Sequence, residues 1–216
     1  MPLPFFHNLV SAAGRRADPC ASFYDTGMVA LLSNNALVSV LSYDEPRPKL
    51  LARCPDGEVH SWALIPPSHT LSRSVEVLVS IGQTVYVVDA TDCEDRFLDI
   101  GPFSHISVSP NGRFSALYTD SGRAHVITSD FQTRLSEHDS KSKTPPQYLQ
   151  WCGNDAVVIA WEDELHLLGP GDSVAKFFYD TRIHLVQGEA PKPLHRGPQL
   201  LTTFLDRPRW RPRHNQ

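Results

Sequence analysis

The sequence lacks the short motifs that mark the commoner catalytic and metal sites. It contains no Cys-x-x-Cys pair, no His-Glu-x-x-His, no Gly-x-Ser-x-Gly and no glycine-rich phosphate loop ahead of a helix. Those patterns are typical of zinc sites, metalloproteases, serine hydrolases and nucleotide-binding proteins, respectively. Their absence removes local support for these classes and leaves open an enzyme whose site is assembled from distant loops.

An excess of positive charge and long apolar runs are also missing. The 20 Lys and Arg residues are outnumbered by 24 Asp and Glu, so the formal net charge is -4 at pH 7. Such a chain has no general attraction for nucleic acid or anionic lipid. No apolar run approaches the ~20 residues of a membrane helix, and the N-terminal apolar patch lacks the basic region of a signal peptide. We expect a soluble, globular protein without a nucleic-acid partner.

Cysteine is scarce and its spacing is wide. Cys20, Cys54, Cys93 and Cys152 are distributed over a chain of 216 residues. A chain of this length can bury a core without disulfide bonds. We therefore expect reduced thiols and a cytoplasmic protein.

What the sequence does contain is alternation of apolar and polar residues between compact turns. The clearest stretch predicts strands at 103–108, 114–119 and 123–128, separated by Pro110-Asn111-Gly112 and Asp120-Ser121-Gly122. Each turn supplies residues that tolerate positive φ, so the stretch indicates a three-stranded antiparallel meander. A lone meander is only marginally stable in water, so its apolar faces must pack against similar units.

Similar units occur on both sides of this meander. Predicted first strands near His60, Phe103 and Gln147 recur about every 40 to 45 residues, the length of a four-stranded propeller blade. An additional hairpin is predicted at 28–43, because two apolar runs flank Ser33-Asn34-Asn35. The approximate predicted blades are 59–100, 103–136 and 147–180.

The predicted fold is all-β: a partial WD40-like β-propeller of about three four-stranded antiparallel blades plus a hairpin. A β-sandwich is the alternative, but its long Greek-key connections are not found. The Trp-Asp and Gly-His signatures of WD40 blades are absent at blade ends, so the propeller would be divergent. Propellers close with about four to eight blades, so we expect the chain to be part of a larger ring.

The predicted organisation has three parts. Residues 1–25 form an irregular lead-in, residues 26–186 form the partial propeller, and residues 187–216 form a disordered tail rich in Pro and Arg. Within the second part, 182–186 is predicted to begin a new first strand, and 137–144 is predicted to be a polar linker. The alternation stops after this strand. A tail without alternation cannot bury enough apolar surface to offset its ordering entropy, so we expect it to be disordered.

Three groups of polar residues are candidates for a functional site. Glu162-Asp163-Glu164 could serve acid–base chemistry or a cation, but we interpret it as a solvated hairpin tip. His105, His125 and His166 belong to different predicted strands and have no metal-ligand spacing. The acidic stretch 89–95 lacks the glycine turn and the terminal glutamate of a calcium loop. We therefore predict no catalytic, cofactor-binding or metal-ligating residue.

Several longer stretches suggest a family. The stretches GPFSHISVSPNGRFSALYTDSG (101–122) and, most specifically, QWCGNDAVVIAWEDE (150–164) resemble the vacuolar protein sorting-associated protein 16 family, in its fungal form. The resemblance extends over residues 18–186. It implies a divergent WD40-like propeller in a non-enzymatic scaffold subunit of the class C tethering complexes, HOPS and CORVET.

The resemblance also implies a location and partners. These complexes act in intracellular protein transport, where they tether endosomal and vacuolar membranes before fusion. The chain would be cytoplasmic and peripheral on those membranes through its complex, with other class C subunits as partners and no cofactor. Family members have further blades and an α-solenoid that holds a Sec1/Munc18-type subunit. We expect this chain to be a truncated member that does not bind that subunit by itself.

Two other functions remain alternatives from the residues alone. One is a generic propeller adaptor that binds unrelated proteins. The other is a propeller-fold hydrolase, whose site would require three or more titratable groups that converge at the mouth of the central channel.

Overall fold

The structure is a computed structural model, and it describes residues 21–24, 27–42 and 47–185. These residues form four antiparallel sheets of four strands each and one short 3-10 helix, η1 (Pro67–His69). The first sheet contains β1 (Ala21–Tyr24), β2 (Gly27–Leu31), β3 (Ala36–Val40) and β4 (Lys49–Arg53). The second contains β5 (Val59–Ile65), β6 (Glu76–Ile81), β7 (Thr84–Val88) and β8 (Cys93–Asp95). The third contains β9 (Phe103–Val108), β10 (Phe114–Thr119), β11 (Arg123–Thr128) and β12 (Arg134–Asp139). The fourth contains β13 (Tyr148–Cys152), β14 (Ala156–Ala160), β15 (Glu164–Leu168) and β16 (Val174–Phe178).

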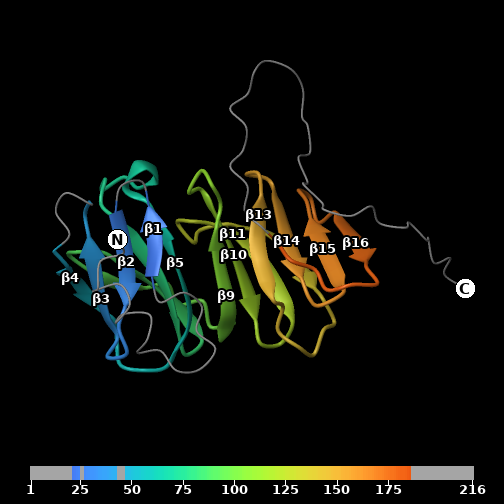
Figure 1. Ribbon diagram of the computed structural model, residues 1–216, viewed down its shortest axis with the longest axis horizontal. Coiled ribbons are helices and arrows are strands. Elements are labelled where there is room, and N and C mark those ends of the chain that lie inside the picture. Colours follow the sequence, from blue (N-terminus) through green and yellow to red (C-terminus); the bar gives the residue numbers. More distant parts are fainter. Residues whose placement is uncertain (1–20, 25–26, 43–46, 186–216) are drawn as a thin grey trace, which may run out of the picture.

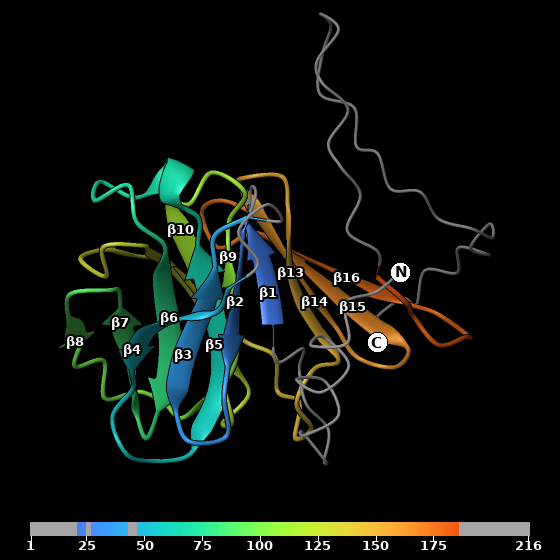
Figure 2. The ribbon, with the colours of Figure 1, turned by 60° about the vertical axis from the view of Figure 1, so that its left-hand side comes forward.

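Each sheet is a simple meander in which consecutive strands pair. The four meanders stand side by side, with their faces packed together, as the blades of a propeller do (Figure 1, Figure 2). The first strands of neighbouring sheets lie close together, because β9 contacts both β5 and β13. The all-β, propeller-like fold predicted from the sequence is confirmed.

The second strand of each later sheet is buried on both faces, because period-two alternation sends its side chains into two different cores. In β6, Val77 and Val79 pack with the first sheet, whereas Leu78 packs with Phe103 and Leu117 of the third sheet. The same division holds for β10 and β14, so three apolar cores lie between the four sheets. A fourth cluster lies on the outer face of the last sheet and is covered by Tyr179, Ile183 and Leu185, which follow β16.

Turn chemistry agrees with the predicted hairpins at two positions in particular. Asn35, in the first hairpin, has φ of 58° and occupies the left-handed region that asparagine tolerates. Gly112 has φ of +69°, and a Cβ there would lie 2.3 Å from the Cβ of His69. Glycine is therefore required at this turn both for its backbone conformation and for the close approach of η1.

The structure corrects several of the predicted boundaries. The hairpin at 28–43 is the middle of a full four-stranded sheet, because β1 and β4 pair on its two sides. The predicted irregular lead-in is wrong at residues 21–24, because these residues form β1. β1 has only four residues, ASFY, and its short sequence gives too little alternation to predict a strand.

The bounds of the outer strands also differ from the predicted ones. The fourth strand of the second sheet is Cys93–Asp95, and residues 96–100, the last of the predicted blade 59–100, form a connection. β12 continues to Asp139, inside the predicted linker. Residues 182–185 form no strand, although the amide of Ile183 donates to the carbonyl oxygen of Glu162 at 2.8 Å. The predicted tail at 187–216 lies outside the described residues.

Among the described residues, no helix has both the length and the apolar composition needed to cross a membrane.

Candidate functional site

The acidic tip 162–164 does not bring its three carboxylates together. Glu162 is exposed and accepts hydrogen bonds from Arg182 at 2.6 and 3.1 Å. Glu164 points to the ring of His166, with 2.7 Å between Oε1 and Nε2. The backbone oxygen of Asp163 accepts from the amide of Tyr179 at 2.8 Å. The tip therefore anchors the segment after β16 and one histidine, a role that the sequence did not reveal.

The three histidines weighed from the sequence lie in three different settings. His105, on β9, packs edge-on against Tyr118. His125, on β11, faces the second sheet, on the same side of β11 as Ile127 of the core between the second and third sheets. His166, on β15, faces the third sheet. Across the described residues, no group of three or more His, Cys, Asp or Glu side chains could hold a metal ion.

His166 is part of a buried polar chain between the third and fourth sheets. Its ring is only 1 % exposed, and its Nδ1 lies 3.0 Å from Nε2 of His138 on β12. With Glu164 on its other nitrogen, both ring nitrogens of His166 have partners. Trp161 packs edge-on against the same ring. Burial lowers the pKa of His166 and of His138, so both rings are neutral near pH 7.

The acidic stretch 89–95 forms a turn and the strand β8. One carboxylate oxygen of Asp89 accepts from the amide and hydroxyl of Thr91 and from the amide of Asp92, at 2.7 to 2.8 Å. These hydrogen bonds lower the pKa of Asp89, because they stabilise its ionised form. Asp89 thus closes the turn before β8.

The three described cysteines carry free thiols, and Cys20 lies outside the described residues. Cys54 is buried in the core between the first two sheets. Burial raises the pKa of its thiol to about 11, so Cys54 stays protonated and unreactive at neutral pH.

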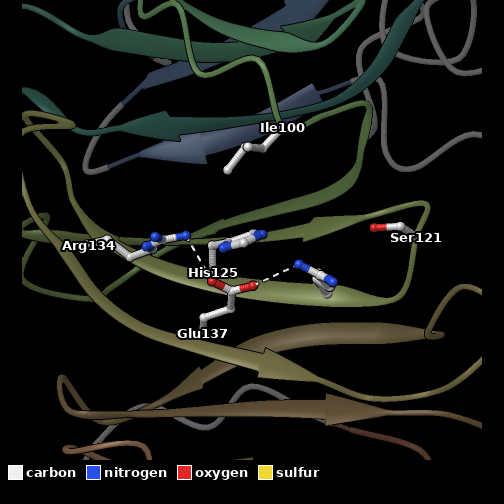
Figure 3. Close-up of a pocket in the computed structure, with 6 residues that line it drawn as sticks. Ile100, Ser121, His125, Arg134 and Glu137 are labelled. Atoms are coloured by element: carbon white, nitrogen blue, oxygen red, sulfur yellow. Dashed lines mark hydrogen bonds and ion pairs between the residues drawn. The ribbon is translucent and has the colours of Figure 1, made fainter.

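One pocket of about 480 Å³ lies beside the outer half of the third sheet (Figure 3). It is lined by side chains from β11, β12 and two connections: Ile100, Ser121, Arg123, His125, Arg134 and Glu137. Of these, the sequence singled out only His125. Glu137 lies beside His125 because strand pairing places the two residues opposite each other, and no local sequence pattern predicts that register.

Comparison with known proteins gives a consistent result. The chain is 34% identical over 171 residues to the probable vacuolar protein sorting-associated protein 16 homolog of Schizosaccharomyces pombe, covering 74% of this chain and 20% of that protein. It is 29% identical over 188 residues to Protein VACUOLELESS1 of Arabidopsis thaliana, covering 76% and 22%. It is 28% identical over 179 residues to the vacuolar protein sorting-associated protein 16 homolog of Dictyostelium discoideum, covering 76% and 21%.

The chain therefore spans about a fifth of the length of these curated relatives. A family model described as "Vps16, N-terminal region" matches residues 16–190, which include every described strand. The resemblance seen in the sequence is confirmed, and the chain belongs to the Vps16 family, within its N-terminal region.

Proposed function

We propose that this chain supplies a non-enzymatic propeller scaffold to a class C tethering complex that acts in vacuolar protein sorting. The observation that carries the proposal is the family match over residues 16–190, joined to relatives whose names state vacuolar protein sorting. At the finer level, the complex is HOPS or CORVET, and its other subunits are the partners. The chain acts in the cytoplasm, held on endosomal and vacuolar membranes through that complex, and uses no cofactor.

The architecture supports a scaffold physically. A surface that positions other subunits has to keep its shape, and here three apolar cores hold the four sheets together. Polar connections join the strands at the ends of the sheets, where partners can reach them. Such a body offers rigid edges and loops for protein contacts.

The proposal is tested in fission yeast, whose relative is 34% identical to this chain. The aligned segment of that relative is replaced by residues 16–190, and the tagged chimera is the only copy in the cell. We expect the chimera to co-purify with the other class C subunits and to restore vacuolar sorting and vacuole morphology.

The control chimera carries Ile159→Ala, which opens a cavity between the third and fourth sheets. We expect it to support sorting less well at elevated temperature. The proposal is rejected if the unmodified chimera accumulates to the level of the native protein yet co-purifies with none of the class C subunits. That outcome would favour a generic adaptor.

A further inference from the structure

The pocket lies where the interface between the second and third sheets changes from apolar to polar. Leu117 and Ile127 belong to the apolar core of that interface, and His125 follows on the same face of β11. The outer strand of the second sheet, β8, has only three residues. Ile100, from the connection after β8, lies across the pocket from His125 (Figure 3).

A comparison within the chain shows what is missing around His125. It is the third residue of β11 and pairs with Leu117, the fourth residue of β10. His166 is likewise the third residue of β15 and pairs with Ile159, the fourth residue of β14. The two histidines therefore hold equivalent places in consecutive sheets, and both face the preceding sheet.

Their surroundings differ in one respect that points to a ligand. The neighbouring sheet supplies His138 to Nδ1 of His166. His125 is 3 % exposed, and its Nδ1 is buried without a hydrogen-bond partner. A buried polar atom without a hydrogen-bond partner costs free energy. A bound group that reaches Nδ1 removes this cost.

The charges around the pocket indicate which kind of group would bind beside His125. The residue two positions before His166 is Glu164, whereas the residue two positions before His125 is Arg123. Arg123 and Arg134 each donate to a different oxygen of Glu137, at 3.2 and 2.8 Å. Two guanidinium groups thus share one carboxylate, so the lining keeps a net positive charge. A guanidinium has five N–H donors, and each of these two uses one on Glu137.

We propose that the pocket lined by Arg123, His125 and Arg134 binds an oxyanion group. The group accepts hydrogen bonds from the two guanidiniums and from His125, while Ser121 and Ile100 line the rest of the pocket. The oxyanion is either a free inorganic ion or a carboxylate of an acidic protein segment. This site does not depend on the proposed tethering role.

The test measures binding of sodium sulfate and, separately, of a hexaglutamate peptide to the full chain by calorimetry and thermal unfolding. Sodium chloride at equal ionic strength gives the baseline, which removes general screening. We expect both readouts to be saturable for the oxyanion that fits. Saturation by sulfate alone assigns a small inorganic ion, and tighter binding of the peptide assigns an acidic segment.

Three variants make the test specific. Arg134→Gln should weaken binding about threefold to tenfold, the range for losing one charged hydrogen bond at a half-exposed site. Glu137→Gln should strengthen it by a similar factor, because the competing carboxylate is removed. Arg182→Gln, which breaks an exposed Arg–Glu pair elsewhere, should leave it unchanged.

The gain in Glu137→Gln separates a binding site from a loss of folding, since a damaged fold cannot bind more tightly. The proposal is overturned if neither probe exceeds the chloride baseline. It is equally overturned if Arg134→Gln and Glu137→Gln bind sulfate and peptide as the native chain does.

Discussion

At the scale of single residues, the hydroxyl of Ser140 takes part in three hydrogen bonds at the boundary between the third and fourth sheets. Ser140 Oγ donates to the carbonyl oxygen of Gly122 at 2.8 Å, so the hydroxyl of Tyr118 is the donor in their 2.8 Å contact. The amide of Ser142 donates to the same Oγ at 3.1 Å. Tyr118 is 1 % exposed and has no access to water as a substitute partner.

These bonds predict an order of stabilities for two small changes. Tyr118→Phe removes one donor, and Ser140 keeps its other partners, so we expect a loss of about 1 kcal/mol. Ser140→Ala leaves the buried hydroxyl of Tyr118 and the amide of Ser142 without their partner, while the carbonyl oxygen of Gly122 keeps the backbone amide of residue 140, so we expect about 2 kcal/mol or more. Urea unfolding measures both. The double variant should lose less than the sum, and a simple sum would contradict the shared bond.

The buried histidines predict how stability depends on pH. Burial lowers the pKa of His125, His138 and His166 from the ordinary 6.5, so the folded chain holds these rings neutral. The unfolded chain takes up protons first as the pH falls through about 6.5, so the free energy of unfolding decreases below that pH.

The pH dependence has a direct test. Thermal unfolding is followed from about pH 7.5 down to about pH 5.5. We expect the melting temperature to fall over this range in the native chain and to fall less in the His138→Gln, His166→Gln double variant, which cannot take up those protons. Equal losses in the two proteins would show that other groups govern the acid response.

At the scale of elements, the second strand of a sheet does the most for packing, because it contributes to two cores. Ile159, on β14, is 0 % exposed and packs among residues of the third and fourth sheets. Leu50, on the outer strand β4, is 59 % exposed. The two positions therefore differ in burial while both are apolar residues on strands.

We expect Ile159→Ala to cost about 2–5 kcal/mol of unfolding free energy, because it removes buried methyl groups and leaves a cavity. Leu50→Ala should change stability by about 0.5 kcal/mol or less, since its side chain already meets water. Chemical denaturation of both variants provides the comparison. A loss of equal size at the two positions would contradict the assignment of the core between the third and fourth sheets.

Elements with strong alternation were predictable from the sequence, and those without it were not. The strands β9, β10 and β11 fall on the predicted ranges, because apolar residues there alternate between two compact turns. β1 is too short to show a period, and β8 is built from CED, which has no apolar face. Outer strands meet solvent, so their sequences carry little of the signal that burial imposes.

The polar clusters were less predictable than the strands, for a related reason. His138 and His166 are 28 residues apart, and their contact depends on how two sheets face each other. The pairing of His125 with Glu137 depends on strand register. Alternation tells which residues share one face of a strand, but it does not tell which sheet that face meets.

At the scale of the whole molecule, the outer strand of the fourth sheet is the most exposed of the strands whose burial the structure describes. All five residues of β16 are exposed, and in the described part of the chain β16 pairs only with β15. Phe178 is 71 % exposed, with Phe177 and Val174 close to it along the same strand. An apolar edge strand of this kind favours pairing between chains.

We expect Phe178→Lys to raise the concentration at which the chain self-associates by about tenfold, because it removes an apolar contact and adds a charge at the edge. Leu71→Lys is the control, since Leu71 is fully exposed on the loop after η1 and belongs to no strand. Sedimentation over a range of concentrations measures the effect. Identical behaviour of the two variants would place the contact elsewhere.

The strand β9 is held by side-chain hydrogen bonds to β5 of the second sheet and to β13 of the fourth sheet. The hydroxyl of Ser61 on β5 donates to the carbonyl oxygen of Phe103 at 2.6 Å. The indole of Trp151 on β13 donates to the carbonyl oxygen of Ser107 at 3.0 Å. Opening the third sheet therefore requires both adjoining sheets to release it. In deuterated water, the backbone amides that form the hydrogen bonds between β9 and β10 should be the last in the molecule to exchange their protons.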